Sequence, residues 1–256
     1  MPADGLHLAI DGATARLTIR RPAKFNAMSR AMWRELAEAM ASLAARAEVR
    51  VLVVAGEGAH FCAGGDIAEY PGFRFDEASL RDFHEREVWG GLSALLACDK
   101  PVIAQIDGHC MGAGVEIASC CDIRVASASA RFGAPIARLG FPMAPREAEL
   151  VAREAGLASA REMLLQAAVL DAPTMLSRGF LHAVVPEVAL ADDVLTRARR
   201  MAELSPEAAR LNKQTLRALA AGTPAGALVN RAYEYAGHAE HREGIAAFLD
   251  KRTPAF

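Results

Sequence analysis

Residues 101–127 read PVIAQIDGHCMGAGVEIASCCDIRVAS, and the order of apolar runs and glycines in this stretch decides the fold. Its first part, 101–108, is a short apolar run closed by a glycine, which is typical of a strand buried on both faces. A glycine-rich turn then opens a helix over 112–121, and residues 122–127 form a second strand-like run. Two buried strands joined by a helix indicate an α/β core with helical crossovers.

Segments before this stretch fit the same fold class. Apolar residues alternate over 6–10 and 17–19 on either side of a turn at 11–12, which predicts a β-hairpin. Ser29 stands before apolar residues at helical spacing and is expected to cap the start of that helix. The run VRVLVVAG (49–56) predicts a further buried strand.

The C-terminal part of the chain is predicted to be mainly helical. Strand signals fade after about residue 145, and apolar residues then recur at helical spacing between glycine and proline breaks. We therefore expect an α/β core over residues 1–195 and a helical region over 196–256. A helical end of this kind either docks on a neighbouring subunit or caps its own chain.

Charge and composition narrow the range of partners. The 256 residues carry a formal net charge of −2, and no block of like charges indicates a nucleic-acid tail. No apolar run is long enough to span a membrane, and the N-terminus lacks the basic and apolar segments of a signal peptide. The five cysteines are odd in number and lack metal-site spacing, so we expect reduced thiols, no metal and a cytoplasmic location.

Two glycine-rich loops follow predicted strands. The first is AHFCAGGDI (59–67) and the second is DGHCMGAGVEI (107–117). Small residues let a ligand approach main-chain N–H groups closely, and a pair of such groups stabilises a developing oxyanion by about 3 kcal/mol per donor. Each loop by itself is equally consistent with a tight strand-to-helix turn. A dinucleotide-binding fingerprint is rejected, since Ile117 stands where its third small residue is required.

Glu116 is the only charged residue between positions 110 and 121. On a helix it shares a face with Gly112 and Ala113, so its carboxyl group is expected to lie over the second loop. Burial raises the pKa of such an acid while a helix N-terminus lowers it, and a group held between these effects suits proton transfer. The alternative is a structural ion pair with one of three arginines, Arg124, Arg131 or Arg138.

Taken in order, the motifs resemble the crotonase, or enoyl-CoA hydratase/isomerase, superfamily over nearly the whole chain. The segments that carry the resemblance are RRPAKFNAM (20–28), FCAGGDIAE (61–69), KPVIAQIDGHCMGAGVEIASCCDIRVAS (100–127), ARFGAPIARLGF (130–141) and HREGIAAFLDKRTPAF (241–256). The resemblance implies a spiral of ββα units with a helical C-terminal trimerisation region, assembled as a homotrimer or hexamer. It also implies acyl-CoA thioester substrates, with coenzyme A as part of the substrate and no separate cofactor.

The resemblance assigns residues at the site as well. It implies that the thioester oxygen binds the peptide N–H groups of Ala63 and Ala113, with Glu116 as general acid or base. The coenzyme A contacts that it implies are Lys24, the strand-like run of Ala63, Gly64, Gly65, Asp66 and Ile67 at the adenine, and Phe248 and Lys251 from the tail of a neighbouring subunit. For Lys24, a solvated charged rim is an equally good interpretation.

The sequence departs from the family at the second acid. Hydratases of this family have a glutamate after the proline of the FG-P segment, and Ile136 stands at that position, where an apolar side chain cannot move a proton. Glu147 or Glu149 offers a replacement, although both are expected on the outer face of a helix. His84 and Glu85 are further candidates, within a segment that we interpret as a polar, mobile helix.

We therefore predict an acyl-CoA enzyme of the hydratase/isomerase type that stabilises a thioester enolate and uses a single glutamate for proton transfer. The missing second acid makes double-bond migration easier to explain than hydration, because one carboxylate suffices to move a proton between two carbons. The alternatives are a non-catalytic coenzyme A-binding protein, or a decarboxylase or thioester hydrolase that uses the same oxyanion site. We expect YPGFRF (70–75) and the segment up to Trp89 to line the acyl pocket.

Overall fold

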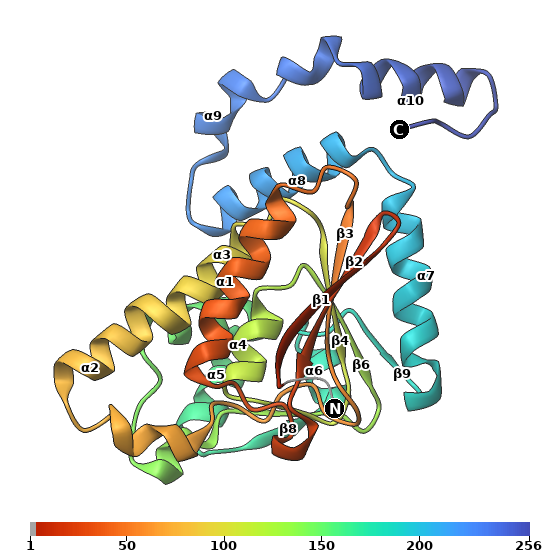
Figure 1. Cartoon of the computed structure of the whole chain (residues 1–256). Coiled ribbons are helices and arrows are strands. Elements are labelled where there is room, and N and C mark those ends of the chain that lie inside the picture. The colour runs from red at the N-terminus through yellow and green to blue at the C-terminus, as the bar shows by residue number, and fades with distance from the viewer. Residues whose placement is uncertain (1–3) are drawn as a thin grey trace.

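The computed structural model describes residues 4–256, and a six-stranded main sheet runs through the centre of the molecule (Figure 1). Its strands lie in the order β1-β2-β3-β4-β6-β9. Their bounds, in that order, are Gly5–Asp11, Thr14–Arg20, Val51–Gly56, Val102–Ile106, Ile123–Ser127 and Ala183–Val185. β1 and β2 form the predicted antiparallel hairpin, and the later neighbours in this sheet are parallel.

A smaller sheet, in the order β5-β7-β8, lies beside the main one. Its strands are His109–Met111, Arg131–Gly133 and Val169–Asp171. Along the chain, β4 is followed by β5 and then by helix α4, while β6 is followed by β7 and then by helix α5. The chain thus repeats two strands and a helix, which confirms the predicted spiral of ββα units.

Helices cover both sheets. Their bounds are Arg30–Ala44 (α1), Glu77–Asp82 (α2), Trp89–Leu96 (α3), Ala113–Ser119 (α4), Pro145–Leu165 (α5), Ala172–Ser177 (α6), Leu190–Ala202 (α7), Pro206–Ala220 (α8), Ala225–Leu228 (α9) and Ala239–Leu249 (α10). Ser29 caps α1 as predicted, because its hydroxyl accepts a hydrogen bond from the Met32 N–H at 3.3 Å.

Both faces of the main sheet are buried at β3, which explains why this strand is apolar throughout. Val53 belongs to a cluster with Val194 and Ala198 of α7. Its neighbours Leu52 and Val54 belong to the larger cluster, which also contains buried residues of α1, α3 and α4. Successive residues of a strand face opposite sides of the sheet, so an uninterrupted apolar run requires helices on both sides.

The same packing corrects the predicted boundary at residue 195, which falls inside α7. Val194 and Ala198 of this helix are both buried against the sheet, so the sheet-bound part of the chain extends to Ala202. Beyond it, α9 and α10 extend away from the main body at the top of Figure 1. These C-terminal helices are predominantly exposed, and α10 presents Phe248 with 82% of its surface accessible.

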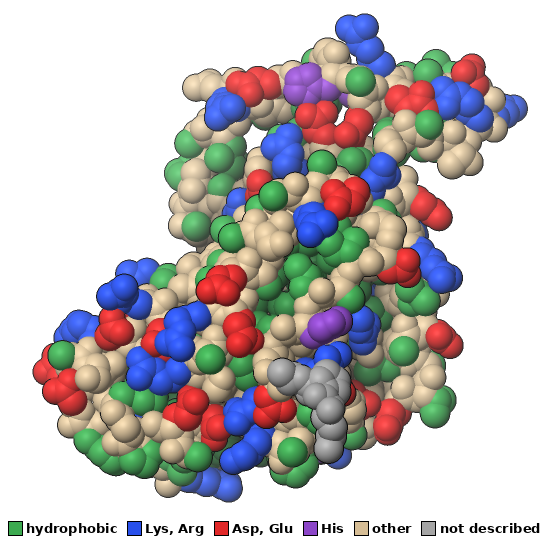
Figure 2. All heavy atoms as spheres, in the orientation of Figure 1, with side chains coloured by type: hydrophobic (Ala, Val, Ile, Leu, Met, Phe, Trp, Pro, Cys, Tyr) green, Lys and Arg blue, Asp and Glu red, His purple; other side chains and the backbone are tan. Residues whose placement is uncertain are grey.

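The surface carries mixed charge. Figure 2 shows Lys and Arg side chains interspersed with Asp and Glu side chains over the visible face. Among residues 4–256, no helix is both long and apolar enough to cross a bilayer. All five cysteines are free thiols, in agreement with the sequence prediction.

Candidate active site

The two glycine-rich loops lie against each other because their backbones pair. The Cys62 N–H donates to the His109 carbonyl at 2.9 Å, and the Met111 N–H donates to the Cys62 carbonyl at 2.8 Å. Gly114, in the first turn of α4, approaches the same segment so closely that a Cβ would lie 2.6 Å from the Cys62 carbonyl oxygen. Glycine at 114 therefore allows the start of α4 to pack directly on the first loop.

A cavity of about 230 Å³ opens where the loops meet. One wall is made by the loops themselves, and the other by the segments 70–88 and 135–147. The lining is mainly apolar, but five ionisable side chains face into it: Tyr70, Arg74, His84, Glu116 and Glu147. A mainly apolar cavity with a few converging polar groups is the usual form of a small-molecule site.

Two unpaired peptide N–H groups reach this cavity. Ala113 is the first residue of α4, so its N–H has no acceptor within the helix. Gly65 and Met28 form a parallel β-bridge, in which Met28 bonds to the two neighbours of Gly65. The Met28 N–H donates to the Gly64 carbonyl, and the Asp66 N–H donates to the Met28 carbonyl, both at 2.8 Å. The Gly65 N–H therefore points away from Met28, and it has no acceptor within residues 4–256.

The prediction that Ala63 supplies the first donor is wrong. Its N–H donates to the carbonyl of Phe25 at 3.0 Å and is not free to bind a ligand. Ala63 still lines the cavity, two residues before the glycine whose N–H is free. Successive N–H groups of an extended segment point in different directions, and the sequence alone does not say which of them faces the ligand.

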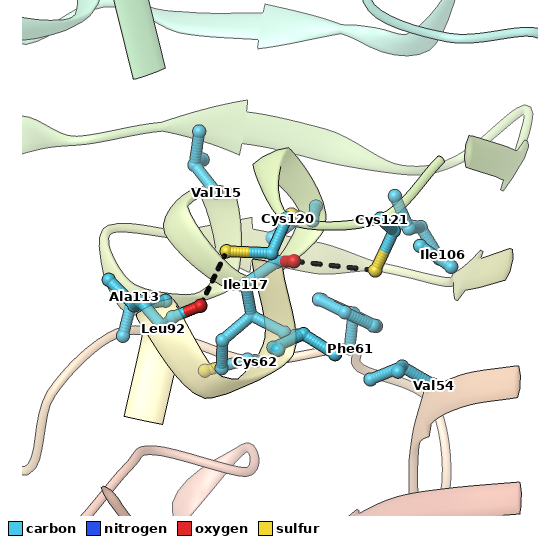
Figure 3. Close-up of a cluster of buried hydrophobic side chains, with 14 of the residues drawn as sticks. Val54, Phe61, Cys62, Leu92, Ile106, Ala113, Val115, Ile117, Cys120 and Cys121 are labelled. Carbon is cyan, nitrogen blue, oxygen red and sulfur yellow. Dashed lines mark hydrogen bonds between the residues drawn. The ribbon is translucent and has the colours of Figure 1, made fainter. Parts of the chain in front are cut away.

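Glu116 is buried at the first turn of α4 and faces the cavity. Figure 3 shows the surrounding packing, in which buried side chains such as Phe61 and Leu92 enclose this helix. Within the described residues, the Glu116 carboxyl group has neither a hydrogen bond nor an ion pair. The alternative prediction, a structural ion pair with an arginine, is therefore wrong. Burial, and after it the charge of Glu147, raise the pKa of Glu116 well above its ordinary value.

The three arginines that were candidate partners bind elsewhere. Each donates to main-chain carbonyl groups: Arg124 to Phe180 and Cys121, Arg131 to Ser129 and Ala130, and Arg138 to Ala167. Arg124 also lies 3.4 Å from a Glu154 oxygen. None of the three arginines therefore pairs with Glu116.

A second carboxyl group lines the cavity, but it comes from a different segment than the one in which the family pattern places its second glutamate. Ile136 lines the cavity as expected and offers no acid there. Glu147, however, is buried in the first turn of α5 and also lines the cavity. Its predicted place on the outer face of the helix is therefore wrong, whereas Glu149 is exposed as predicted. Glu147 lies on the same face of α5 as the buried Leu150 and Val151, three and four residues further on, and this face packs inward.

His84 holds Glu147 in place. It lies in the π-helical turn η3 (Phe83–Val88), and its Nδ1 is 3.0 Å from Glu147 Oε1. Its Nε2 is 3.4 Å from Arg74 Nη1. Because arginine only donates, Nε2 is the acceptor, which leaves the hydrogen on Nδ1 to be donated to Glu147.

His84 is thus part of the site rather than of a polar, mobile helix, and that interpretation is wrong for this residue. Its side chain is only 18% exposed. The neighbouring candidate, Glu85, forms an ion pair with Arg146 at 3.0 Å, and both of these side chains are more than 40% exposed. Turns of the π type occur often at functional sites, and η3 directs His84 inward and Glu85 outward.

The residues predicted to contact coenzyme A lie in different places in the structure. Ala63, Gly64, Gly65 and Ile67 line the cavity. Asp66 instead caps the turn η2 (Ile67–Gly72) and pairs with Arg21 at 2.9 Å. Burial would raise the pKa of Asp66, but its bonds to Arg21 and to the Ala68 N–H, together with the nearby charge of Lys24, lower it overall.

Lys24, Phe248 and Lys251 are exposed and do not meet within one chain. In Figure 1 the short red turn that contains Lys24 lies near the bottom of the view and α10 lies at the top. Contacts of these three residues with coenzyme A stay predictions.

The segment YPGFRF (70–75) lines the cavity only in part. Tyr70 and Arg74 face into it, while Phe73 packs in the core and Phe75 is 88% exposed. Burial raises the pKa of Tyr70 to about 12, so its hydroxyl keeps its proton. The sequence placed Arg74 within a segment expected to line the acyl pocket but did not single it out, since no local pattern distinguishes it from the arginines of the surface.

Comparisons with known proteins identify the family and the fold. The chain matches the family model for enoyl-CoA hydratase/isomerase over residues 9–256. An enoyl-CoA hydratase/carnithine racemase from Magnetospirillum magneticum has a TM-score of 0.95 and 35% identity, with coverage of 100% of this chain and 96% of that one. Pseudomonas aeruginosa AtuE has a TM-score of 0.90 and 33% identity, with coverage of 97% and 98%. The 2,3-dehydroadipyl-CoA hydratase of Escherichia coli is 33% identical over 94% of this chain and 93% of its own length.

The chain therefore belongs to the enoyl-CoA hydratase/isomerase family. The resemblance to the crotonase superfamily is confirmed, and so is the prediction of an acyl-CoA enzyme of that type.

Proposed function

We propose that the protein hydrates 2-enoyl-CoA thioesters, with Glu116 and Glu147 as its acid and base. The observation that carries the proposal is that two buried carboxyl groups and two unpaired peptide N–H groups line one cavity. Hydration requires both kinds of group, because charge develops on the thioester oxygen while two protons move.

The N–H groups of Gly65 and Ala113 would hold the thioester oxygen. When water adds to the β-carbon, the electrons of the double bond move toward the carbonyl, and the oxygen gains negative charge. Each donor aimed at that oxygen contributes about 3 kcal/mol to the stability of the transition state. Both donors are peptide groups fixed by backbone pairing and by the start of a helix, so they need no rearrangement during the reaction.

The two carboxyl groups divide the proton transfers. Glu116 has a raised pKa and holds a proton, so it donates to the α-carbon. Glu147 accepts a hydrogen bond from His84 and is thereby held as an acceptor, so it takes a proton from the attacking water. The oxygen of that water bonds to the β-carbon, and a proton returned from Glu147 to Glu116 restores the resting site.

Double-bond migration is the second candidate, and the position of Glu116 favours it. A single carboxyl group near both carbons can remove a proton from one and return it to the other through the same enolate. This reaction does not need Glu147, which provides a way to separate the two activities.

The proposed assembly is a homotrimer or hexamer, in which the C-terminal helices meet neighbouring subunits. Large apolar side chains on these helices are exposed in the single chain: Leu216, Val229, Tyr233, Ile245, Phe248 and Leu249. Exposed apolar side chains concentrated in one region favour burial at an interface. Multi-angle light scattering should give the mass of three or six chains. A cytoplasmic location is also proposed, and the free thiols support it.

The proposed chemistry is tested by incubating the purified protein with crotonyl-CoA and with a 3-enoyl-CoA and then weighing the products. A product heavier by one water supports hydration, and an unchanged mass with a shifted double bond supports migration. Free coenzyme A would favour hydrolysis instead, and decarboxylation would be tested separately as loss of carbon dioxide from added methylmalonyl-CoA, which carries the carboxylate that this reaction removes. Binding without any product would favour the non-catalytic alternative.

A further inference from the structure

The acyl side of the cavity contains a cation without a counter-ion. Arg74 is the only lysine or arginine among the described residues that line the cavity. No carboxylate oxygen within residues 4–256 lies in ion-pair distance of its guanidinium group, and its one side-chain polar contact is the long one to His84 at 3.4 Å. The nearest carboxylate, that of Glu147, lies beyond the His84 ring and does not pair with Arg74 directly. A partly buried charge without a direct ion-pair partner is costly, and a ligand carboxylate would supply that partner.

Two aromatic rings lie against this guanidinium group. The Arg74 Cζ atom lies 3.8 Å from the centroid of Phe141 and 4.5 Å from that of Tyr70. Cation–π contacts of this kind help to hold the charged group in place without accepting conventional hydrogen bonds from its N–H donors. Of the five donors, one is directed at His84, and the others have no acceptor in the described part of the chain.

We propose that Arg74 binds a carboxylate at the far end of the acyl chain, so that the preferred substrates are CoA thioesters of carboxylated acyl chains. The proposal rests on the proposed function, because the thioester must lie at the opposite wall of the same cavity. The planar fork of arginine matches the two oxygens of a carboxylate, and such charge-assisted pairs are stronger than neutral hydrogen bonds. An apolar chain would leave the remaining donors unpaired on binding.

The test compares binding of dicarboxylic and monocarboxylic CoA thioesters of equal chain length by isothermal titration calorimetry. Saturated chains are used, so that no turnover is needed: succinyl-CoA with butyryl-CoA, glutaryl-CoA with pentanoyl-CoA, and adipoyl-CoA with hexanoyl-CoA. For at least one pair we expect the carboxylated chain to bind the wild-type protein at least tenfold more tightly. Arg74→Gln should reduce that preference about 10- to 100-fold, mainly by weakening the carboxylated ligand.

Two further variants make the result specific. Arg81→Gln is the control and lies on the neighbouring helix α2. The Arg81 side chain is 71% exposed and pairs with Glu77 at 2.8 Å, so this change should leave both affinities unchanged. Arg74→Lys keeps the charge but loses the planar fork, and it should give an intermediate preference. If Arg74→Gln weakens both ligands of a pair equally, or if the wild-type protein prefers no carboxylated chain, the inference is wrong.

The binding test can fail independently of the proposed function. Turnover of crotonyl-CoA without a preference for carboxylated chains would overturn the role of Arg74 alone. A preference that depends on Arg74, in a protein that turns over no enoyl-CoA, would support that role and overturn the proposed hydration. If none of these thioesters binds, both are overturned.

Discussion

The two walls of the cavity are built in different ways. The thioester wall, formed by residues 61–67 and 109–116, presents main-chain N–H groups fixed by a β-bridge and a helix start. The acyl wall, formed by segments 70–88 and 135–147, presents side chains held by one another. In the proposed mechanism, charge stabilisation depends on the backbone, whereas the second acid is a side chain that another segment can supply. The proposed use of Glu147, with Ile136 at the position of the family's second glutamate, is an example.

Removal of the acid on the thioester wall should have the largest effect. Glu116→Gln keeps the shape of the side chain but cannot give or take a proton, so kcat/KM for crotonyl-CoA should fall about 10³-fold. The decay of the thioester absorbance measures this rate. Both hydration and double-bond migration should be lost together, because both use this residue. A variant that retains more than a tenth of the wild-type rate would show that Glu116 does not move the proton.

Removal of the acid on the acyl wall should separate the two activities. Glu147→Gln should reduce hydration about 10²-fold and affect migration much less, since only hydration activates a water. Glu149→Gln is the matched control on the same helix, and its exposed side chain should leave both rates within about twofold of the wild type. Equal losses of both activities in Glu147→Gln would contradict the division of roles between the walls.

The positioning of Glu147 by His84 should contribute less than Glu147 itself. His84→Ala removes the hydrogen bond of 3.0 Å and should lower kcat for hydration about tenfold, with a small effect on KM. Because His84 acts through Glu147, the loss should disappear in the Glu147→Gln background. Additive losses in the double variant would show that His84 acts independently.

The last expected effect is on stability rather than on rate, and its size depends on pH. The pKa of Glu116 is raised above its ordinary value of 4.5, so above that pH the unfolded chain loses a proton that the folded protein retains. Stability is therefore lost as pH rises, by up to about 1.4 kcal/mol per pH unit until the folded group also ionises. Glu116→Gln should remove this loss. The free energy of unfolding of this variant, measured in urea, should therefore rise relative to that of the wild type as the pH increases from 5 to 7. Glu149→Gln should follow the wild type.

Much of the thioester wall could be predicted from the sequence, because its signals are local. Apolar runs ending in glycine predict β3 and β4, and the position of Glu116 after a glycine-rich turn places it over the second loop. Only the identity of the first donor was wrong. The choice between Ala63 and Gly65 depends on which N–H is taken by a neighbouring strand, and that pairing with residues 25–28 joins distant parts of the chain.

The acyl wall could not be predicted in the same way, because its contacts are long-range. Glu147 and His84 are 63 residues apart, and neither belongs to a local motif. The general tendency of glutamate to be exposed predicted the wrong face for Glu147. The position of Arg74 in the cavity likewise depends on a long-range contact, because Phe141 from a distant segment lies against its guanidinium group.

The most direct test of the central claim is a crystal structure with acetoacetyl-CoA bound. The account predicts that the thioester oxygen lies about 2.7–3.1 Å from the nitrogens of both Gly65 and Ala113, with the α- and β-carbons between Glu116 and Glu147. A thioester oxygen bound by other groups, or reacting carbons out of reach of both carboxyl groups, would contradict it.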